Sequence, residues 1–137
     1  MHSAYIDGAS HGNPGESGIG VIIYNENQKV LRAFGYYLGR LTNNMAEYMA
    51  AIFALQTLRE LGVSSAIIYA DSELLIRQLK GEYKVKNEKL MPLYLQIKFF
   101  MRNFHEINFC HLGREKNVLA DRLANRAVLE KGYVSEV

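Results

Sequence analysis

The chain has 137 residues, a length that suits one domain spanning residues 1–137 and leaves little room for two. Hydrophobic residues make up 49% and charged residues 22%, which excludes a disordered or fibrous protein and indicates a globular one. The formal net charge of +2 at pH 7 does not by itself identify a partner.

The cysteine content and the apolar pattern bear on the compartment. A single cysteine, Cys110, excludes an internal disulfide framework, suggests a reducing compartment and argues against a structural zinc site. The start MHSAYIDGAS does not read as a signal peptide, and apolar runs stay well below the roughly 20 residues of a membrane span. We therefore expect a soluble, cytoplasmic domain with no membrane partner.

The first third of the chain is rich in β-branched residues and predicts three strands, over residues 4–9, 19–24 and 30–38. A turn-rich stretch with Gly12, Pro14 and Gly15 as breakers separates the first two, and residues 25–28 predict a hairpin turn. The short connections predict an antiparallel meander.

The pattern then changes to helices alternating with strands. A helix is expected over residues 43–61, with Thr42 as its N-cap and Gly62 as its stop. The unbroken apolar run 66–70 is typical of a strand buried on both faces. The remaining elements are helices over 72–79 and 90–103, a strand over 107–112 and a helix over 118–131. Together these elements predict an α/β fold, a mixed sheet with helices packed on it.

Aspartate is rare in this chain, and two of its acidic residues occupy unusual positions. Only three of the fourteen acids are Asp, namely Asp7, Asp71 and Asp121. Asp7 falls in or at the end of the first strand, where Asp is disfavoured, although the following Gly8 fits a simple turn equally well. Glu47 shares a helical stripe with alanines and leucines at +3, +4, +7 and +11, so it is expected to face the sheet. A buried carboxylate there needs a cation or strong donors.

Asp71 and Asp121 have both ordinary and functional interpretations. Asp71 follows the buried strand, where it could be the N-cap of the next helix or belong to a site at the carboxyl edge of the sheet. Asp121 lies in the first turn or so of the last helix, where the helix dipole favours an acid in any case. If the ordinary interpretation held for each acid, however, carboxylates from four elements would lie along one sheet without cations. Such a set suits hard ions such as Mg²⁺ or Mn²⁺, two of which can support phosphodiester hydrolysis.

Basic residues are concentrated in one segment. Residues 77–102 hold seven basic and two acidic side chains, a local net charge of +5, whereas residues 1–76 carry −3. A solvated helix face would explain this segment, but Tyr83 among the lysines also suits a nucleic-acid backbone.

Four motifs carry a resemblance to a known family. YIDGASHGNPG (5–15), TNNMAE (42–47), YADS (69–72) and REKNVLADRLAN (114–125) resemble type 1 ribonucleases H, in order and in register over essentially the whole chain. The resemblance implies a five-stranded mixed sheet, with its first three strands antiparallel, flanked by helices. It also implies an endonuclease that cleaves the RNA strand of RNA–DNA hybrids and leaves 3′-hydroxyl and 5′-phosphate ends.

The resemblance assigns roles to the four acids. By analogy, Asp7 bridges two Mg²⁺ ions, for which Mn²⁺ can substitute, and Asp71 completes one metal shell with the attacking water. Asp121 helps to hold the other ion, while Glu47 binds metal and contacts a ribose hydroxyl.

The resemblance also assigns substrate contacts. The 2′-OH, which distinguishes RNA from DNA, would be read by Gly12–Asn13, Asn43 and Asn44. Asn43 and Asn44 fit an ordinary first helical turn equally well. Arg40 and Thr42 match the family's phosphate pocket for the DNA strand, although Thr42 alone is simply an N-cap.

The chain departs from the family pattern in three places. The loop before the last helix is short, GREKN, and Arg114 stands where many relatives have a mobile histidine, as in a short-loop group of the family. Arg114 is expected to act electrostatically, because a guanidinium stays protonated, and His111 is expected to be structural. The chain has no Trp, so Tyr83 is the nearest candidate for stacking on DNA. The family's long basic handle is reduced to residues 81–89, where Lys84, Lys86 and Asn87 could contact DNA phosphates.

Two other functions fit the same motifs. One is a non-catalytic hybrid-binding paralogue, against which stands the presence of all four acids. The other is a nuclease of the same fold with a different nucleic-acid substrate. We expect the chain to act as a monomer without an obligate protein partner.

Overall fold

The computed structural model describes residues 1–136. Its strands are β1 (His2–Gly12), β2 (Gly15–Tyr24), β3 (Val30–Leu41), β4 (Ser65–Ala70), β5 (Glu106–His111) and β6 (Tyr133–Ser135). Its helices are α1 (Asn43–Glu60), α2 (Glu73–Leu79), α3 (Met91–Met101), the 3₁₀ turn η1 (Arg114–Lys116) and α4 (Val118–Glu130). Within this part of the chain, no helix is long and apolar enough to cross a membrane.

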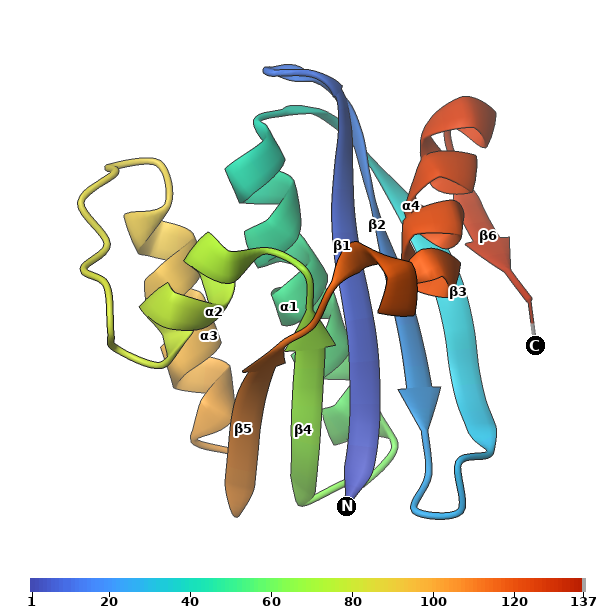
Figure 1. Ribbon diagram of the computed structural model, residues 1–137, viewed down its shortest axis with the longest axis vertical. Coiled ribbons are helices and arrows are strands. Elements are labelled where there is room, and N and C mark those ends of the chain that lie inside the picture. Colours follow the sequence, from blue (N-terminus) through green and yellow to red (C-terminus); the bar gives the residue numbers. More distant parts are fainter. Residues whose placement is uncertain (137) are drawn as a thin grey trace.

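The strands form one mixed sheet in the order β5-β4-β1-β2-β3-β6 (Figure 1). The pairs β1–β2 and β2–β3 are antiparallel, and β1–β4 and β4–β5 are parallel. The predicted α/β class, the antiparallel meander and the order of the elements are therefore confirmed.

The first hairpin is longer than the sequence indicates. Residues 10–18, expected to be a turn, belong mostly to β1 and β2, and only Asn13 and Pro14 lie between the two strands. Gly15 stands within the pairing, where an added Cβ would lie 2.4 Å from the carbonyl oxygen of His11. This glycine, the first residue of β2, thus permits the close approach of the two strands at the tip of the hairpin.

A sixth strand, β6, corrects the expected count of five. It pairs antiparallel with the edge of β3, and its central Val134 is 4% exposed. Three residues are too few to give an alternating pattern, so the sequence does not reveal this strand.

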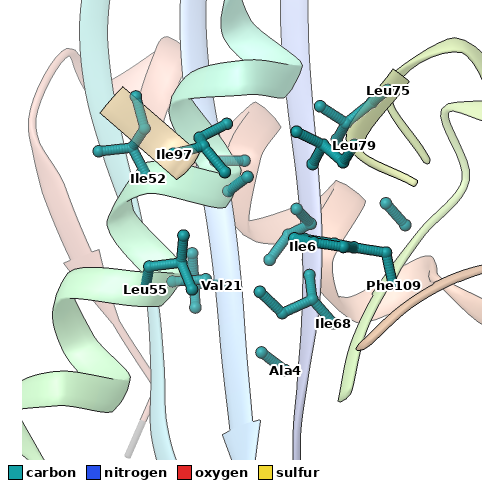
Figure 2. Close-up of a cluster of buried hydrophobic side chains, with 14 of the residues drawn as sticks. Ala4, Ile6, Val21, Ile52, Leu55, Ile68, Leu75, Leu79, Ile97 and Phe109 are labelled. Carbon is teal, nitrogen blue, oxygen red and sulfur yellow. The ribbon is translucent and has the colours of Figure 1, made fainter. Parts of the chain in front are cut away.

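Helices cover the two faces of the sheet unequally. The main core lies between the sheet and α1, α2 and α3, where Figure 2 shows Ile6 and Ile68 of the sheet among Leu55, Leu75 and other helix side chains. On the opposite face, α4 packs over β2, β3 and β6 and forms a smaller cluster (Figure 1).

On the face where α4 packs, the half of the sheet formed by β4 and β5 is not covered by a helix of residues 1–136. Alternate residues of β4 are therefore buried and half-buried, which corrects the expectation of a strand buried on both faces. Tyr69 of β4 lies on the open side and stacks on Tyr5 of β1, with ring centroids 4.8 Å apart. Tyr24 meets Tyr5 edge-on at 5.5 Å.

Candidate active site

Two of the four acids lie on neighbouring parallel strands. Ile6 of β1 is paired with Ala70, the last residue of β4, so Asp7 is the next residue of β1 and Asp71 is the first residue after β4. Asp7 lies in the middle of the longer β1, whereas Asp71 directly follows the carboxyl end of β4, and this pairing puts the two acids together.

Asp71 is not the cap of the following helix. The N-cap of α2 is Ser72, whose hydroxyl accepts a hydrogen bond from the amide of Leu75 at 3.2 Å. The ordinary interpretation of Asp71 is thereby excluded, and its carboxylate is available at the sheet edge.

Glu47 reaches the same edge from α1. Thr42 caps this helix, as expected, by accepting from the amide of Met45. Glu47 is 9% exposed, which confirms that it faces the sheet, and it accepts a hydrogen bond from the backbone amide of Gly8. An added Cβ on Gly8 would lie only 2.4 Å from the carbonyl carbon of Ala46. Only glycine lets α1 pack this closely on β1.

Asp121 is brought to the site by the start of α4. The helix approaches β2 closely, since a Cβ on Gly20 would lie 2.1 Å from the carbonyl oxygen of Ala120. Asn117, 2% exposed, donates from Nδ2 to the carbonyl oxygen of Ile6 at 2.8 Å. Gly20 is paired with Asp7, so both contacts hold the first turn of α4 beside the same stretch of β1.

The acids converge without a protein cation among them. Carboxylate oxygens of Asp7, Glu47 and Asp71 lie within 4.8 Å of one another, and the Asp121 side chain contacts Asp7. Burial, reinforced by the neighbouring carboxylates, raises the pKa of Asp7 far above its ordinary value. Burial also raises the pKa of Glu47, although the Gly8 amide opposes that shift. Among residues 1–136, the ion pairs do not involve these four acids.

This donor set fits a divalent cation. Two of the carboxylates are buried, and three of them crowd together in a geometry that like charges oppose. The ligand atoms are all oxygens, as hard ions such as Mg²⁺ and Mn²⁺ prefer.

The four acids lie in a cleft of about 470 Å³. Asn43 and Asn44 of the first turn of α1 also line it, as does Arg114 of η1. The structure therefore brings together the four predicted acids, two of the predicted ribose readers, Asn43 and Asn44, and the predicted arginine. His111 ends β5, in agreement with the expected strand.

A second hollow, of about 230 Å³, lies beside the first and shares Asn44 with it. Asn13, Thr42 and Asn87 line it, and Asn13 accepts a hydrogen bond from the amide of Asn43 at 3.0 Å. The side-chain oxygen of Asn87, Oδ1, accepts a hydrogen bond from the backbone amide of Lys89 at 2.8 Å.

The remaining substrate candidates lie outside the linings of both hollows. Gly12 adopts a φ of +117° at the tip of the first hairpin, and Arg40 is exposed on β3. Lys84 and Lys86 are exposed in the loop between α2 and α3. Tyr83 is 47% exposed, and the Arg77 guanidinium lies 5.4 Å from its ring centroid.

Three polar residues in or beside the cleft have no role in the sequence-based prediction. Asn117 anchors α4, and His11 and Asn125 line the cleft and bond to each other at 2.7 Å. Their partners are more than 100 positions away, so no local pattern indicates them. The one available signal is that all three lie inside the quoted motifs.

Comparison with known proteins supports the same family. The family model described as reverse transcriptase-like matches residues 5–127. The bifunctional protein Rv2228c of Mycobacterium tuberculosis is 39% identical over 123 residues, which are 89% of this chain and 34% of that protein. The chain thus spans about a third of the length of the first curated relatives it matches.

Two further relatives match over most of their length. The ribonuclease H of Rippkaea orientalis is 38% identical, with 96% of this chain and 88% of that protein covered. The crystal structure of LC11-RNase H1 in complex with RNA/DNA hybrid superposes with a TM-score of 0.91 at 38% identity, covering 96% of this chain and 99% of the other. The fold, the acids in one cleft and these matches agree, and the chain belongs to the type 1 ribonuclease H family.

Proposed function

We propose that this domain is an endoribonuclease that hydrolyses the RNA strand of RNA–DNA hybrids. The observation that carries the proposal is the meeting of Asp7, Glu47 and Asp71 within 4.8 Å, with Asp121 against Asp7, in one open cleft. The likeness to a relative crystallised with an RNA/DNA hybrid supports the choice of substrate.

The four acids would hold two divalent ions, Mg²⁺ or Mn²⁺. Bound there, the ions would supply an activated water and stabilise the leaving oxygen of the phosphodiester. The carboxylates would hold the ions in place because each comes from a different element, β1, α1, the end of β4 or α4. The proposed hydrolysis forms a bond from water oxygen to phosphorus and breaks the bond to O3′. The products are a 3′-hydroxyl and a 5′-phosphate.

Other side chains of the cleft would distinguish the RNA strand of the hybrid from the DNA strand. Asn43 and Asn44 present amides at its rim, where they can bond a ribose 2′-OH that DNA lacks. Gly12 and Asn13, at the tip of the first hairpin, would add to this contact, since the Asn13 side chain accepts a hydrogen bond from the amide of Asn43. The exposed guanidinium of Arg114 would counter phosphate charge, and it cannot act as a base.

The DNA strand would lie toward the second hollow. Thr42 and Asn87 line this hollow, and Arg40 would supply charge near the start of α1. Lys84 and Lys86 would contact phosphates further along the same strand, with Tyr83 as an aromatic neighbour. We further propose that the chain forms one cytoplasmic domain that acts as a monomer without an obligate protein partner.

The test is a cleavage assay on matched RNA–DNA, RNA–RNA and DNA–DNA duplexes with a metal titration. We expect cleavage of the hybrid alone, dependent on Mg²⁺ or Mn²⁺ and abolished by Asp7→Asn with the fold retained. Equal cleavage of double-stranded DNA, or full activity in chelator, would contradict the proposal. End-labelling of the products distinguishes a 5′-phosphate from a 3′-phosphate.

The same assay separates the alternatives. A hybrid-binding paralogue would retain affinity for the hybrid and release no product with either metal. Its expected signature is a missing carboxylate, and all four are present in this chain. A nuclease with another substrate would cleave one of the other duplexes faster.

A further inference from the structure

A chain of hydrogen bonds runs from β1 to one of the four acids. Nε2 of His11 lies 2.7 Å from Oδ1 of Asn125. Nδ2 of Asn125 in turn donates to the carboxylate of Asp121 at 3.2 Å and to its backbone carbonyl at 2.9 Å. All three residues line the same cleft.

The direction of each bond in this chain is fixed. Nδ2 of Asn125 donates to two acceptors on Asp121, so Oδ1 is the atom that faces His11. An amide oxygen can only accept, so Nε2 of His11 carries the hydrogen and donates. The amide of Asn125 therefore cannot turn over without losing both of its bonds to Asp121.

These hydrogen bonds restrain a side chain that is exposed to solvent. Asp121 is exposed on the first turn of α4, and Asn125 stands one turn later on the same face. His11 comes from β1, the strand that also holds Asp7. The Asp121 carboxylate is thus held in place by β1, the strand that carries Asp7, as well as by its own helix α4.

We propose that His11 and Asn125 are positioning residues that hold the Asp121 carboxylate in its cation-binding orientation. This inference rests on the proposed metal site. Partners that orient a ligating group in this way commonly change metal affinity by about tenfold or more when they are removed.

The test measures Mn²⁺ binding by calorimetry on the intact chain without nucleic acid. His11→Leu and Asn125→Leu are each expected to weaken Mn²⁺ binding about tenfold. Because the two residues act in series, the double variant should bind no more weakly than the weaker single variant. His11→Gln keeps an N–H donor at similar reach and should recover most of the affinity.

A matched control and a second variant keep the test decisive. His105→Leu removes an exposed histidine far from the acids in sequence and should leave Mn²⁺ binding unchanged. If Asn125→Leu fails to fold, His11→Leu, which alters an exposed side chain, still decides the matter. Unchanged affinity in His11→Leu, or no recovery in His11→Gln, would overturn the inference. Absence of Mn²⁺ binding in the unaltered chain would instead overturn the proposed metal site.

Discussion

The carboxylate of Glu47 accepts a hydrogen bond from the backbone amide of Gly8, the residue after Asp7. This bond joins α1 to β1 at the point where both carry an acid. It gives the buried Glu47 a strong donor, which partly offsets the cost of its burial.

Gly8→Ala tests this contact. The added methyl would lie 2.4 Å from backbone atoms of Ala46 and Glu47, so α1 must move away from β1. We expect a loss of stability of about 1–3 kcal/mol, as for other overpacked sites, and a loss of cleavage activity. Urea denaturation and the hybrid assay check both. Gly132→Ala is the matched control, because its nearest neighbour is 3.8 Å away and both properties should persist.

The acids predict how stability depends on pH without metal. Burial raises the pKa of Asp7 and Glu47 in the folded chain above the ordinary carboxyl value, so the folded state binds more protons than the unfolded state. Their contribution to stability is therefore greatest below about pH 4 and is lost as the pH rises through the raised values.

Urea denaturation in chelator between about pH 5 and pH 9 measures this loss. Asp7→Asn removes one of the two titrating groups and should flatten the decline relative to the unaltered chain. Equal slopes for the two proteins would contradict the prediction. Mg²⁺ should restore stability mainly at the upper end of the range, where the acids are ionised.

Asn117 is expected to couple the stability of α4 to activity. Asn117→Ala leaves the buried carbonyl oxygen of Ile6 without its donor, at a cost of about 1–3 kcal/mol. Because the start of α4 also carries Asp121, activity should fall even where the variant remains folded, as circular dichroism would verify. Asn108→Ala removes only an exposed bond to Glu106 and should change neither quantity.

The lysines between α2 and α3 predict a salt effect. Gln78, held by the Tyr48 hydroxyl, donates to the carbonyl oxygen of Lys84 at 3.2 Å, so the loop has a fixed anchor in the core. Replacing Lys84 and Lys86 by alanine should weaken hybrid binding and lower the slope of log affinity against log salt by about 0.9 for each lost phosphate contact.

Fluorescence anisotropy with a labelled hybrid over a salt series measures this slope. Lys29→Ala, which removes an exposed lysine at the turn between β2 and β3, is the control and should leave the slope unchanged. An unchanged slope in the variant that lacks both Lys84 and Lys86 would contradict the prediction, because it would mean that these lysines do not contact the phosphates of the hybrid.

Features written in a short stretch of sequence were predictable. The apolar stripe of α1 predicts that Glu47 faces the sheet, and the capping pattern predicts Thr42 and Gly62 at the ends of that helix. The structure confirms both, and Gly62 adopts a φ of +74°. Periodicity and capping are local, so the residues that satisfy them lie within a few positions of one another.

Features that depend on distant residues were not predictable. The donation from Asn117 to Ile6 and the chain from His11 to Asp121 join segments far apart in sequence. The sequence predicts too short a β1 because Gly12 and Gly15 are typical turn residues, whereas Gly15 is needed for the close approach of two backbones. Only the assembled sheet distinguishes these two uses of glycine.

The four acids come from four separate elements, so no continuous segment of the chain contains a cation site. The unfolded chain cannot reproduce this geometry, and a bound cation would favour the native state alone. At a free concentration one hundred times its dissociation constant, such a cation adds about 2.7 kcal/mol to the free energy of unfolding. Thermal melting with and without Mn²⁺ would therefore report on the assembly of the site, with no substrate present.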